Sequence, residues 1–370
     1  MRIAVVCKRQ YTNKDLILDK FGRLYHFPYH WARTGHDVYV NATHYRGLSF
    51  ENYFYDGFRL DSVPIWNPYA WYKKWIRDPV KAFSPDIVLA SGDSHLGMIG
   101  HQIAREIGAA FVFDVYDDYS KFGTNRLPFV KGMFEKSIRQ ADLVVCASEP
   151  LKERIGHISK SIVIAEQGSD FGLFKPIDMK FCRQRCDLPS GVTLLGYCGS
   201  MDSRFDLELL RRALKILNEE HGPTKLVVCG HNVARLNLND PNILYLGLKG
   251  QEDVPYIIGA CDVMLMPYKK TALSETCNPC KLTEYIGCEK PIVCANVSNV
   301  GDYLRGGEKG IYDPGALDGF ITAVREQLSN PSIVQKTSDL EWASIADRYG
   351  RFLASVLEQR TNMGTVKQQV

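Results

Sequence analysis

Short apolar runs, separated by helix-like segments, recur along the whole of this 370-residue chain. Runs of four or five apolar residues between helices are typical of parallel strands that are buried on both faces of a sheet. The runs cover 3–7, 37–41, 86–90, 110–114, 143–147 and 161–164 in the first half, and 194–199, 225–229, 243–246, 263–266 and 291–294 in the second. We therefore predict an α/β protein built from two Rossmann-like domains.

The length also favours two domains, because 370 residues are too many for one comfortable core. We predict an N-terminal domain at 1–172, a C-terminal domain at 173–338 and a helix at 339–370 that packs back on the N-terminal domain. The stretch 170–189 has no clear periodicity and marks the boundary. The tail after Gln359 is polar and is expected to fray.

The bulk composition excludes several classes of protein. An apolar content of 45% and a charged content of 24% are ordinary for a soluble globular chain. A net charge of +3 is too small to favour nucleic acid as the main partner. No stretch approaches the roughly 20 apolar residues of a membrane-spanning helix, and the start lacks a signal-peptide core. We expect a cytoplasmic protein, unless it adheres to a membrane surface.

The 11 cysteines do not indicate a metal centre. Cys146, Cys198, Cys229 and Cys294 lie in apolar runs, where they fit as small buried side chains of a reducing compartment. The pairs Cys277/Cys280 and Cys182/Cys186 have poor spacing for zinc, and no histidine lies near them. We predict no metal and no cofactor.

The stretch 278–293 carries the clearest ligand-binding pattern. Asn278-Pro279 indicates the end of a loop and the start of a helix. Lys281 would then lie near a helix N-terminus, which favours an anion, and Glu284 would follow one turn later on the same face. Such a pair can hold a phosphate and a pair of sugar hydroxyls. The alternative is an ordinary surface ion pair.

A second phosphate-binding pattern lies at Gly199-Ser200, between a strand and a helix. Glycine lets the backbone approach a phosphate, and the helix N-terminus supplies N–H donors. The pattern is not G-x-G-x-x-G, which disfavours an ordinary NAD site. Arg204 is either a further phosphate contact or a solvated surface charge.

Acidic and histidine side chains follow two strands of the first half. Asp114, Asp117 and Asp118 come at the end of one strand, where open α/β sheets bind ligands. Three close carboxylates would raise one another's pKa values and suit general acid–base chemistry. Helix capping and magnesium binding are the alternatives. His95 follows another strand and could orient a substrate, or could be a bystander beside a helix-capping Asp93.

The first strand–helix loop contains Gly22 and Arg23. Gly22 would allow close approach at a helix N-terminus, and Arg23 could pair with a diphosphate. A plain surface loop of ion pairs is the alternative reading.

Aromatic and basic residues cluster at 66–77. Trp71 and Trp75 are spaced i,i+4 with Lys73 and Lys74 between them, a pattern that suits the surface of an anionic membrane. Packing on the N-terminal core and a wall of the acceptor site are the alternatives.

The order of these patterns resembles a known enzyme family. Segments 196–200, 226–230, 242–247, 256–268 and 278–286 resemble, in order, the C-terminal domain of the family 4-type GT-B glycosyltransferases, the glycosyl transferases of group 1. Segments 31–38 and 167–174 resemble their N-terminal and interdomain motifs, so that the resemblance covers nearly the whole chain. A similar Lys-Leu-x-x-Tyr pattern, here at 281–285, occurs in the glucuronosyltransferase of xanthan synthesis.

The resemblance assigns roles to single positions. Glu284 matches the second Glu of the family's E-x7-E motif, which binds the donor ribose, whereas Thr276 stands where the first Glu belongs and Glu275 is one residue off. Lys281, followed by Leu282, resembles the phosphate-binding lysine. Asp117 falls at the catalytic base of the xanthan enzyme.

The resemblance also implies an activity. It implies two facing domains with a deep cleft, in which the C-terminal domain binds a UDP- or GDP-sugar and the N-terminal domain binds the acceptor. The sugar, of hexosyl type, would pass without a metal to a hydroxyl of a glycan or lipid-linked glycan in cell-surface polysaccharide synthesis, at the inner face of the membrane. A nucleotide-sugar 2-epimerase of the same fold and a non-catalytic nucleotide-sugar-binding partner subunit are the alternatives, the latter because of Thr276.

Overall fold

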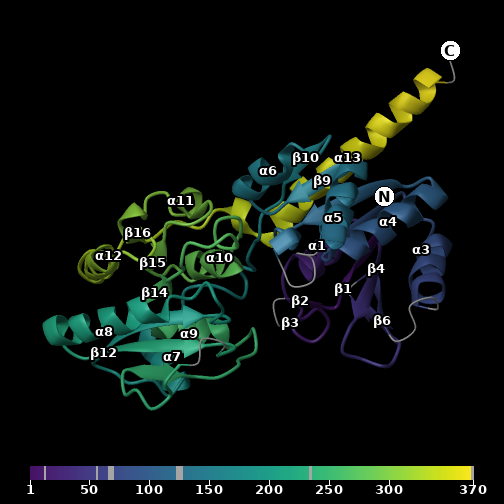
Figure 1. The fold of residues 1–370 in the computed structure, drawn as a ribbon. Helices are drawn as coiled ribbons and strands as arrows, with labels where there is room; N and C mark the ends of the chain where they lie inside the picture. Colours follow the sequence, from purple (N-terminus) through teal and green to yellow (C-terminus); the bar gives the residue numbers. More distant parts are fainter. Residues whose placement is uncertain (12–13, 56, 66–70, 122–127, 233–235, 368–370) are drawn as a thin grey trace. The chain divides into compact units, whose positions relative to one another are not determined.

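The computed structural model describes residues 1–11, 14–55, 57–65, 71–121, 128–232 and 236–367 (Figure 1). The chain forms two compact units. Unit 1 comprises Met1–Gln167, Thr276–Asn278 and Trp342–Val370, and unit 2 comprises Gly168–Glu275 and Pro279–Glu341. Along the chain, the units meet near residues 167 and 341, within a few residues of the limits at 172 and 338 expected from the sequence. The assignment of Thr276–Asn278 to unit 1 had no counterpart in the sequence analysis.

Unit 1 is built on an eight-stranded sheet within the described residues, in the order β10-β9-β8-β7-β1-β4-β6-β5. All neighbours are parallel except β5 and β6. The strands are β1 (Arg2–Lys8), β4 (Asp37–His44), β5 (Glu51–Tyr55), β6 (Phe58–Pro64), β7 (Ile87–Ser91), β8 (Ala110–Val115), β9 (Leu143–Cys146) and β10 (Ile162–Ile164). The six parallel strands predicted for this half are confirmed, whereas β5 and β6 were not predicted. A small separate hairpin joins β2 (Gln10–Tyr11) to β3 (Lys14–Asp15).

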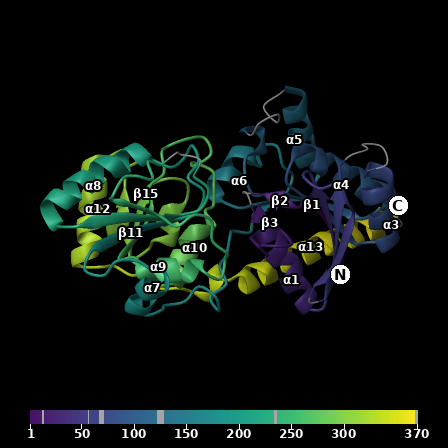
Figure 2. The ribbon, with the colours of Figure 1, turned by 90° about the horizontal axis from the view of Figure 1, so that it is seen from below.

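Helices cover this sheet, and the last helix of the chain is one of them. They are α1 (Arg23–Arg33), the π-helix η1 (Trp71–Arg77), α3 (Asp78–Phe83), α4 (Ser94–Ile107), the short η2 (Tyr119–Lys121), α5 (Pro128–Gln140), α6 (Glu149–Gly156) and α13 (Trp342–Lys367). Figure 2 shows α1 and α13 side by side, and Trp31 Nε1 donates to the Ala346 carbonyl over 2.8 Å. Helix α13 continues to Lys367, so the prediction of a frayed tail from Gln359 is wrong for the described part.

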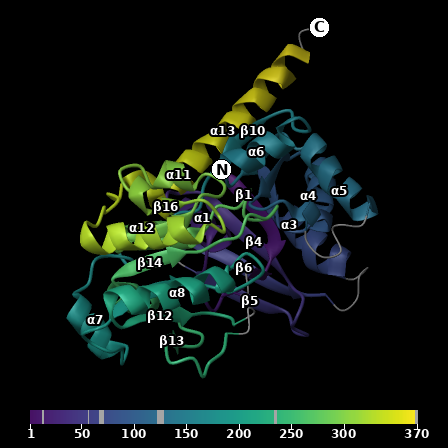
Figure 3. The same cartoon turned by 60° about the vertical axis from the view of Figure 1, so that its left-hand side comes forward.

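The described part of unit 2 is built on a six-stranded parallel sheet in the order β13-β12-β11-β14-β15-β16. The strands are β11 (Thr193–Cys198), β12 (Thr224–Cys229), β13 (Ile243–Tyr245), β14 (Val263–Met266), β15 (Ile292–Ala295) and β16 (Ile311–Tyr312). The helices are α7 (Met179–Arg185), α8 (Leu207–His221), α9 (Val254–Ala260), α10 (Cys280–Gly287), α11 (Val300–Tyr303), η4 (Glu308–Gly310), α12 (Leu317–Ser329) and η5 (Ser338–Leu340). Figure 2 places α8 and α12 on one face of the sheet and α7 and α9 on the other, and Figure 3 shows α8 beside α12. The second predicted parallel sheet is confirmed.

Each sheet has a point where the strand order reverses. In unit 1 the first strand, β1, has β4 on one side and β7 on the other, and in unit 2 the first strand, β11, has β12 on one side and β14 on the other. Open parallel sheets bind ligands beyond the carboxyl ends of the strands at such a reversal. The candidate residues of both units lie at these ends.

Among the described residues, no helix has the length and apolar content needed to cross a membrane.

Candidate functional site

Helix α10 begins at Cys280, directly after Pro279, as the sequence predicted. The backbone of Pro279 is extended, with φ −79° and ψ 114°. Lys281 lies in the first turn of the helix and Glu284 one turn later, and both side chains are half-buried. The predicted succession of a loop, a helix start and a buried strand, β15, is confirmed.

The Gly199-Ser200 turn follows β11 and lies against Lys281. Gly199 has a φ of +140°, which side chains rarely adopt. A Cβ atom added to Gly199 would lie 2.9 Å from Cε and 3.3 Å from Nζ of Lys281. Gly230, at the end of β12, has a φ of +129°, and a Cβ there would collide with the Gly199 carbonyl group. The two glycines therefore let two strand ends and the lysine converge.

Two buried tyrosines hold the ammonium group of Lys281. Its Nζ donates to Tyr268 Oη over 2.6 Å and lies 5.2 Å from the centre of that ring and 5.5 Å from the centre of the Tyr197 ring. Burial is the largest single effect on Lys281 and lowers its pKa, as does Arg204, but Tyr268 and Glu284 raise the pKa, and the net shift is upward. Lys281 is therefore a cation at neutral pH and can compensate a phosphate at the turn.

Ser200 and Arg204 are fixed by neighbours on the same turn. The Ser200 carbonyl accepts from Tyr197 Oη over 2.9 Å. Arg204 donates to both carboxylate oxygens of Asp202, over 3.1 and 2.6 Å, and its guanidinium lies 5.2 Å from the centre of the Tyr268 ring. The alternative of a solvated surface charge therefore does not describe Arg204.

Leu282 and Tyr285 belong to the packing of α10. Leu282 is buried at 1% exposure and its N–H donates to the Pro279 carbonyl, so its side chain serves packing, and its contact with the donor stays a prediction. Tyr285 Oη accepts from the Cys198 N–H over 3.0 Å and ties the helix to the end of β11. Glu284 lies between these two buried residues and remains a candidate ligand.

Thr276 is held within unit 1. Its side chain is buried, and its carbonyl accepts from Ser148 Oγ over 2.7 Å. Nearby, Asn278 Oδ1 accepts from the Gln167 N–H over 2.8 Å. The position at which the family has its first motif Glu is therefore a buried anchor in this chain.

Arg23 and Asp114 form a buried ion pair instead of two ligand contacts. The guanidinium donates to both Asp114 oxygens, over 3.1 and 2.6 Å, and to the Ala165 carbonyl over 2.9 Å. Arg23 is 0% exposed and Asp114 is 1% exposed, and Ser91 Oγ also donates to Asp114. Each charge is buried and paired with the other, which favours a structural role, whereas the catalytic role of Asp114 and the diphosphate contact of Arg23 stay predictions. Gly22 does lie at the N-terminus of α1, with φ +70°.

Of the three predicted acidic residues, Asp117 is the one that the structure leaves as a candidate catalytic base. Asp118 is buried, with Oδ2 lying 2.7 Å from Arg154 Nε and Oδ1 accepting from the Ser120 N–H over 3.1 Å. Asp118 therefore stabilises the turn before η2, which agrees with the capping alternative and disagrees with an acceptor contact. Asp117 is half-buried just after β8 and remains the candidate base.

His95 lies at the reversal point of the unit 1 sheet. Tyr45 Oη is 2.7 Å from His95 Nε2, and Lys8 Nζ is 3.3 Å from Asp93 Oδ1. Burial lowers the pKa of His95, an effect that Asp93 opposes and Lys8 reinforces. Asp93 makes no side-chain cap on α4, so the reading of a capping Asp93 is wrong. A neutral imidazole and an ion pair thus lie at the ends of β1 and β7.

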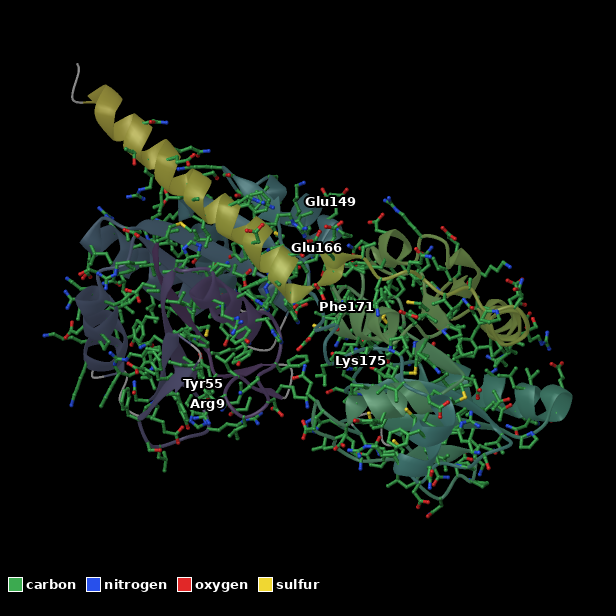
Figure 4. The ribbon with its side chains drawn as sticks, turned by 180° about the vertical axis from the view of Figure 1, so that it is seen from behind. Arg9, Tyr55, Glu149, Glu166, Phe171 and Lys175 are labelled. Carbon is green, nitrogen blue, oxygen red and sulfur yellow. The ribbon has the colours of Figure 1, made fainter. Side chains whose placement is uncertain are left out.

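The first strand–helix loop agrees with the ion-pair alternative. Arg9 is buried and lies 3.0 Å from Asp15 and 2.5 Å from Glu51, and Lys14 lies 3.7 Å from Asp19. Figure 4 shows Arg9 beside Tyr55 of β5.

The tryptophan cluster does not form the exposed face that the sequence predicted. Trp71 is 7% exposed, and its ring centre lies 6.4 Å from that of His95. Trp75 is half-buried and stacks on Phe50, while Lys73 and Lys74 are exposed. The part of the cluster at 66–70 lies outside the described residues.

No metal centre is evident in the part of the chain that the structure describes: it contains no group of three or more His, Cys, Asp or Glu side chains that could hold an ion. The four cysteines of the apolar runs are buried in strands, as predicted: Cys146, Cys198, Cys229 and Cys294.

Sequence reasoning did not assign roles to the tyrosines around Lys281. Tyr197 stands at the end of β11, and Tyr268 follows β14, the strand across the reversal point. Both positions were inside segments quoted for the family resemblance. The rule that ligands bind at the carboxyl ends of neighbouring strands could have identified them.

A scan against protein-family models matches residues 193–330 to the family described as glycosyl transferases group 1. This segment is similar to a group 1 glycosyltransferase domain and makes up less than half of the chain. It runs from β11 to α12 and includes Gly199, Tyr268, Lys281 and Glu284.

Among curated proteins, the chain is similar to TuaH of Bacillus subtilis (strain 168), whose name describes a teichuronic acid biosynthesis glycosyltransferase. The identity is 23% over 182 residues, which cover 46% of this chain and 45% of TuaH. The chain thus spans less than half the length of the curated relative that it matches.

Solved structures show the same fold over the whole chain. The sucrose-phosphate synthase from Thermosynechococcus elongatus is 14% identical, with a TM-score of 0.70 and coverage of 100% of this chain and 98% of that one. HepE of Anabaena in complex with UDP is 14% identical, with a TM-score of 0.66 and coverage of 99% and 100%. The fold is therefore that of the GT-B glycosyltransferases, with two Rossmann-like domains, as the sequence predicted.

Proposed function

We propose that this protein is a glycosyltransferase that uses a nucleotide sugar, with the donor bound by unit 2. The observation that carries the proposal is the contact of Lys281 with the Gly199 turn, inside the segment that matches the group 1 family. A cation, a glycine turn and a helix N-terminus at one place are the elements of a phosphate site.

Different residues of unit 2 bind different parts of the nucleotide. Lys281 and the Gly199-Ser200 turn bind the diphosphate, and Glu284 accepts from the two ribose hydroxyls. Lys281 also offsets the charge that develops on the departing diphosphate, so that a metal is not required. HepE has been solved with UDP and with UDP-glucose, which makes UDP-hexoses the first donors to test, with GDP-sugars next.

The acceptor residues lie in unit 1. Asp117 takes the proton of an acceptor hydroxyl, whose oxygen forms a bond to the anomeric carbon of the sugar. The bond between that carbon and the diphosphate oxygen breaks, and its electron pair leaves with the nucleoside diphosphate. His95, neutral and hydrogen-bonded to Tyr45, orients the acceptor.

The name of the relative supports a proposal for the class of acceptor. TuaH is named for the synthesis of teichuronic acid, a cell-surface polymer, which favours a glycan or lipid-linked glycan as acceptor. Such acceptors are assembled at the cytoplasmic face of the cell membrane, where this protein would bind peripherally.

A donor panel tests the proposal. The protein is incubated with UDP- and GDP-hexoses, and the products are separated. Slow release of nucleoside diphosphate and free sugar supports a transferase. An epimerised sugar would support the 2-epimerase instead. Tight binding without turnover would support the partner subunit, which the buried Thr276 favours.

The division of roles predicts two different defects. Glu284→Ala should weaken donor binding by about ten-fold, the worth of one hydrogen bond to a charged group. Asp117→Ala should leave binding intact and lower turnover by about 10²-fold or more. Glu208→Ala and Asp37→Ala, exposed positions in units 2 and 1, are the controls. Calorimetric binding and single-turnover rates measure both effects, and equal losses of binding alone would contradict this division.

The proposed membrane contact now rests on the exposed Lys73 and Lys74, which precede the half-buried Trp75. Lys73→Gln/Lys74→Gln should reduce co-sedimentation with liposomes rich in anionic lipid, and the loss should disappear at high salt. Lys249→Gln, a surface position in unit 2, is the control. Unchanged co-sedimentation of the double variant would remove the membrane from the proposal.

A further inference from the structure

The hydroxyl groups around Lys281 are connected by hydrogen bonds. Lys281 Nζ donates to Tyr268 Oη over 2.6 Å. Tyr197 Oη donates its one proton to the Ser200 carbonyl over 2.9 Å. Burial, the nearby Tyr268 and a hydrogen bond with Tyr268 together raise the pKa of Tyr197. A hydrogen bond thus links Tyr268 to Tyr197, and Tyr197 is held in turn by the Ser200 carbonyl.

The rings add to this restraint. The Lys281 ammonium lies 5.2 Å and 5.5 Å from the centres of the two rings, and the Gly199 turn lies against its last methylene. Tyr197 is 0% exposed and Tyr268 is 1% exposed, so neither ring can swing away. A lysine side chain has four rotatable bonds, and here its end is held on three sides.

One N–H of the ammonium is used by Tyr268, and an ammonium has three. The restraint therefore fixes the direction of the charge beside the turn without using up its donors. A point charge held in this way binds an anion better than a mobile one, because less freedom is lost on binding.

We propose that Tyr268, assisted by Tyr197, is a positioning residue that fixes the Lys281 ammonium beside the Gly199-Ser200 turn and thereby sets the affinity for the diphosphate of the ligand. The inference rests on the proposed function, because it takes the ligand to be a nucleoside diphosphate or its sugar ester. It assigns Tyr268 no contact with the ligand, and its effect passes through Lys281.

The first experiment removes one hydroxyl. Tyr268→Phe and wild type are titrated calorimetrically with UDP, GDP, UMP and GMP. We expect the affinity of Tyr268→Phe for the diphosphate that binds wild type to fall about ten-fold, with a much smaller loss for the matching monophosphate. Tyr312→Phe is the control, because Tyr312 Oη is buried in unit 2 with no hydrogen-bond partner among the described residues.

A double-mutant cycle tests whether Tyr268 acts through the lysine. In a Lys281→Met background, Tyr268→Phe should cause no further loss of diphosphate affinity. Additive losses would overturn the inference, as would equal losses for the diphosphate and the monophosphate. Tyr197→Phe, which cuts the chain at its second link, should give a smaller loss of the same kind and serves if Tyr268→Phe does not fold.

The pH dependence supplies a readout that a packing role would not move. Burial lowers the pKa of Lys281 and Tyr268 opposes it, so loss of the Tyr268 hydroxyl should lower that pKa. The ratio of variant to wild-type affinity should therefore fall as the pH rises from 7 to 10, and the ratio cancels the titration of the ligand itself. A constant ratio would contradict the inference. If wild type binds neither UDP nor GDP, the proposed function itself fails, which is a different result from equal binding by wild type and variant.

Discussion

At the scale of single residues, the candidate site depends on the absence of a side chain as much as on the presence of charges. Gly199 has a backbone angle that other residues rarely adopt, and the stem of Lys281 occupies the space where a side chain would be. The lysine side chain can therefore lie directly against the backbone of the turn. The unusual backbone angle of the turn and the close contact with Lys281 both depend on Gly199.

Comparing Gly199→Ala with a control glycine should separate the effect of the backbone angle from the effect of the contact with Lys281. The added methyl group would displace Lys281, and we expect loss of nucleoside diphosphate binding by ten-fold or more, measured by calorimetry. Gly222→Ala is the matched control, because Gly222 also has a positive φ (+83°) but nothing lies within 4 Å of its Cβ position. Both variants should lose roughly 1 kcal/mol of stability to the strained φ. Equal binding by the two variants would contradict the role of the contact.

At the scale of elements, buried charges join the helices to the sheet of unit 1. The Arg23–Asp114 pair ties the start of α1 to the end of β8, and Arg23 reaches on to the Ala165 carbonyl after β10. A buried pair adds little net stability over apolar packing, but breaking it leaves an uncompensated charge. Because Arg23 and Asp114 lie at the edge of the sheet where ligands bind, the sequence analysis assigned functional roles to both.

Asp114→Asn tests the structural role against the catalytic one. Loss of the carboxylate should destabilise unit 1 by about 3–5 kcal/mol, because the Arg23 guanidinium stays buried without a counter-charge. All five tryptophans of the chain belong to unit 1, so urea unfolding followed by tryptophan fluorescence reports on this unit. Asp37→Asn, in an exposed pair with Arg2, should cost less than about 1 kcal/mol. Normal stability with lost turnover would restore Asp114 as a catalytic candidate.

At the scale of the whole molecule, the last helix of the chain completes the first unit. His26 of α1 stacks on Trp342 of α13, with ring centres 4.9 Å apart and planes 6° apart. Glu166, labelled near α13 in Figure 4, lies 2.5 Å from Arg348. The core of unit 1 therefore includes residues from both ends of the described sequence.

The His26 stack predicts a dependence of stability on pH. Burial, with a smaller effect of His30, lowers the pKa of His26 to about 3. Since the unfolded chain has a histidine pKa near 6.5, it binds the proton first, and the free energy of unfolding should fall below pH 6.5 by about 1.4 kcal/mol per pH unit. His26→Phe keeps a ring on Trp342 and should flatten this slope. Urea midpoints of both proteins between pH 7.5 and 5 measure it, and parallel slopes would contradict the prediction.

The sequence alone determined the features that depend on neighbours along the chain. The parallel strands, the start of α10 at Cys280 and the glycine turn after β11 were predicted correctly, because apolar periodicity and the backbone limits of proline and glycine act over a few residues. Strands β5 and β6 were missed because polar residues interrupt their sequences, so that neither forms a continuous apolar run.

Only the tertiary structure decided which side chains meet. Arg23 and Asp114 are 91 positions apart, and Tyr268 reaches Lys281 because β14 is placed next to β11. Trp71 and Thr276 were read from spacing or family position, yet both are buried by segments remote in the sequence. Strand order and register bring such residues together, and no local pattern encodes them. The sequence therefore placed a cation near a phosphate turn, whereas the fold supplied the tyrosines that hold it there.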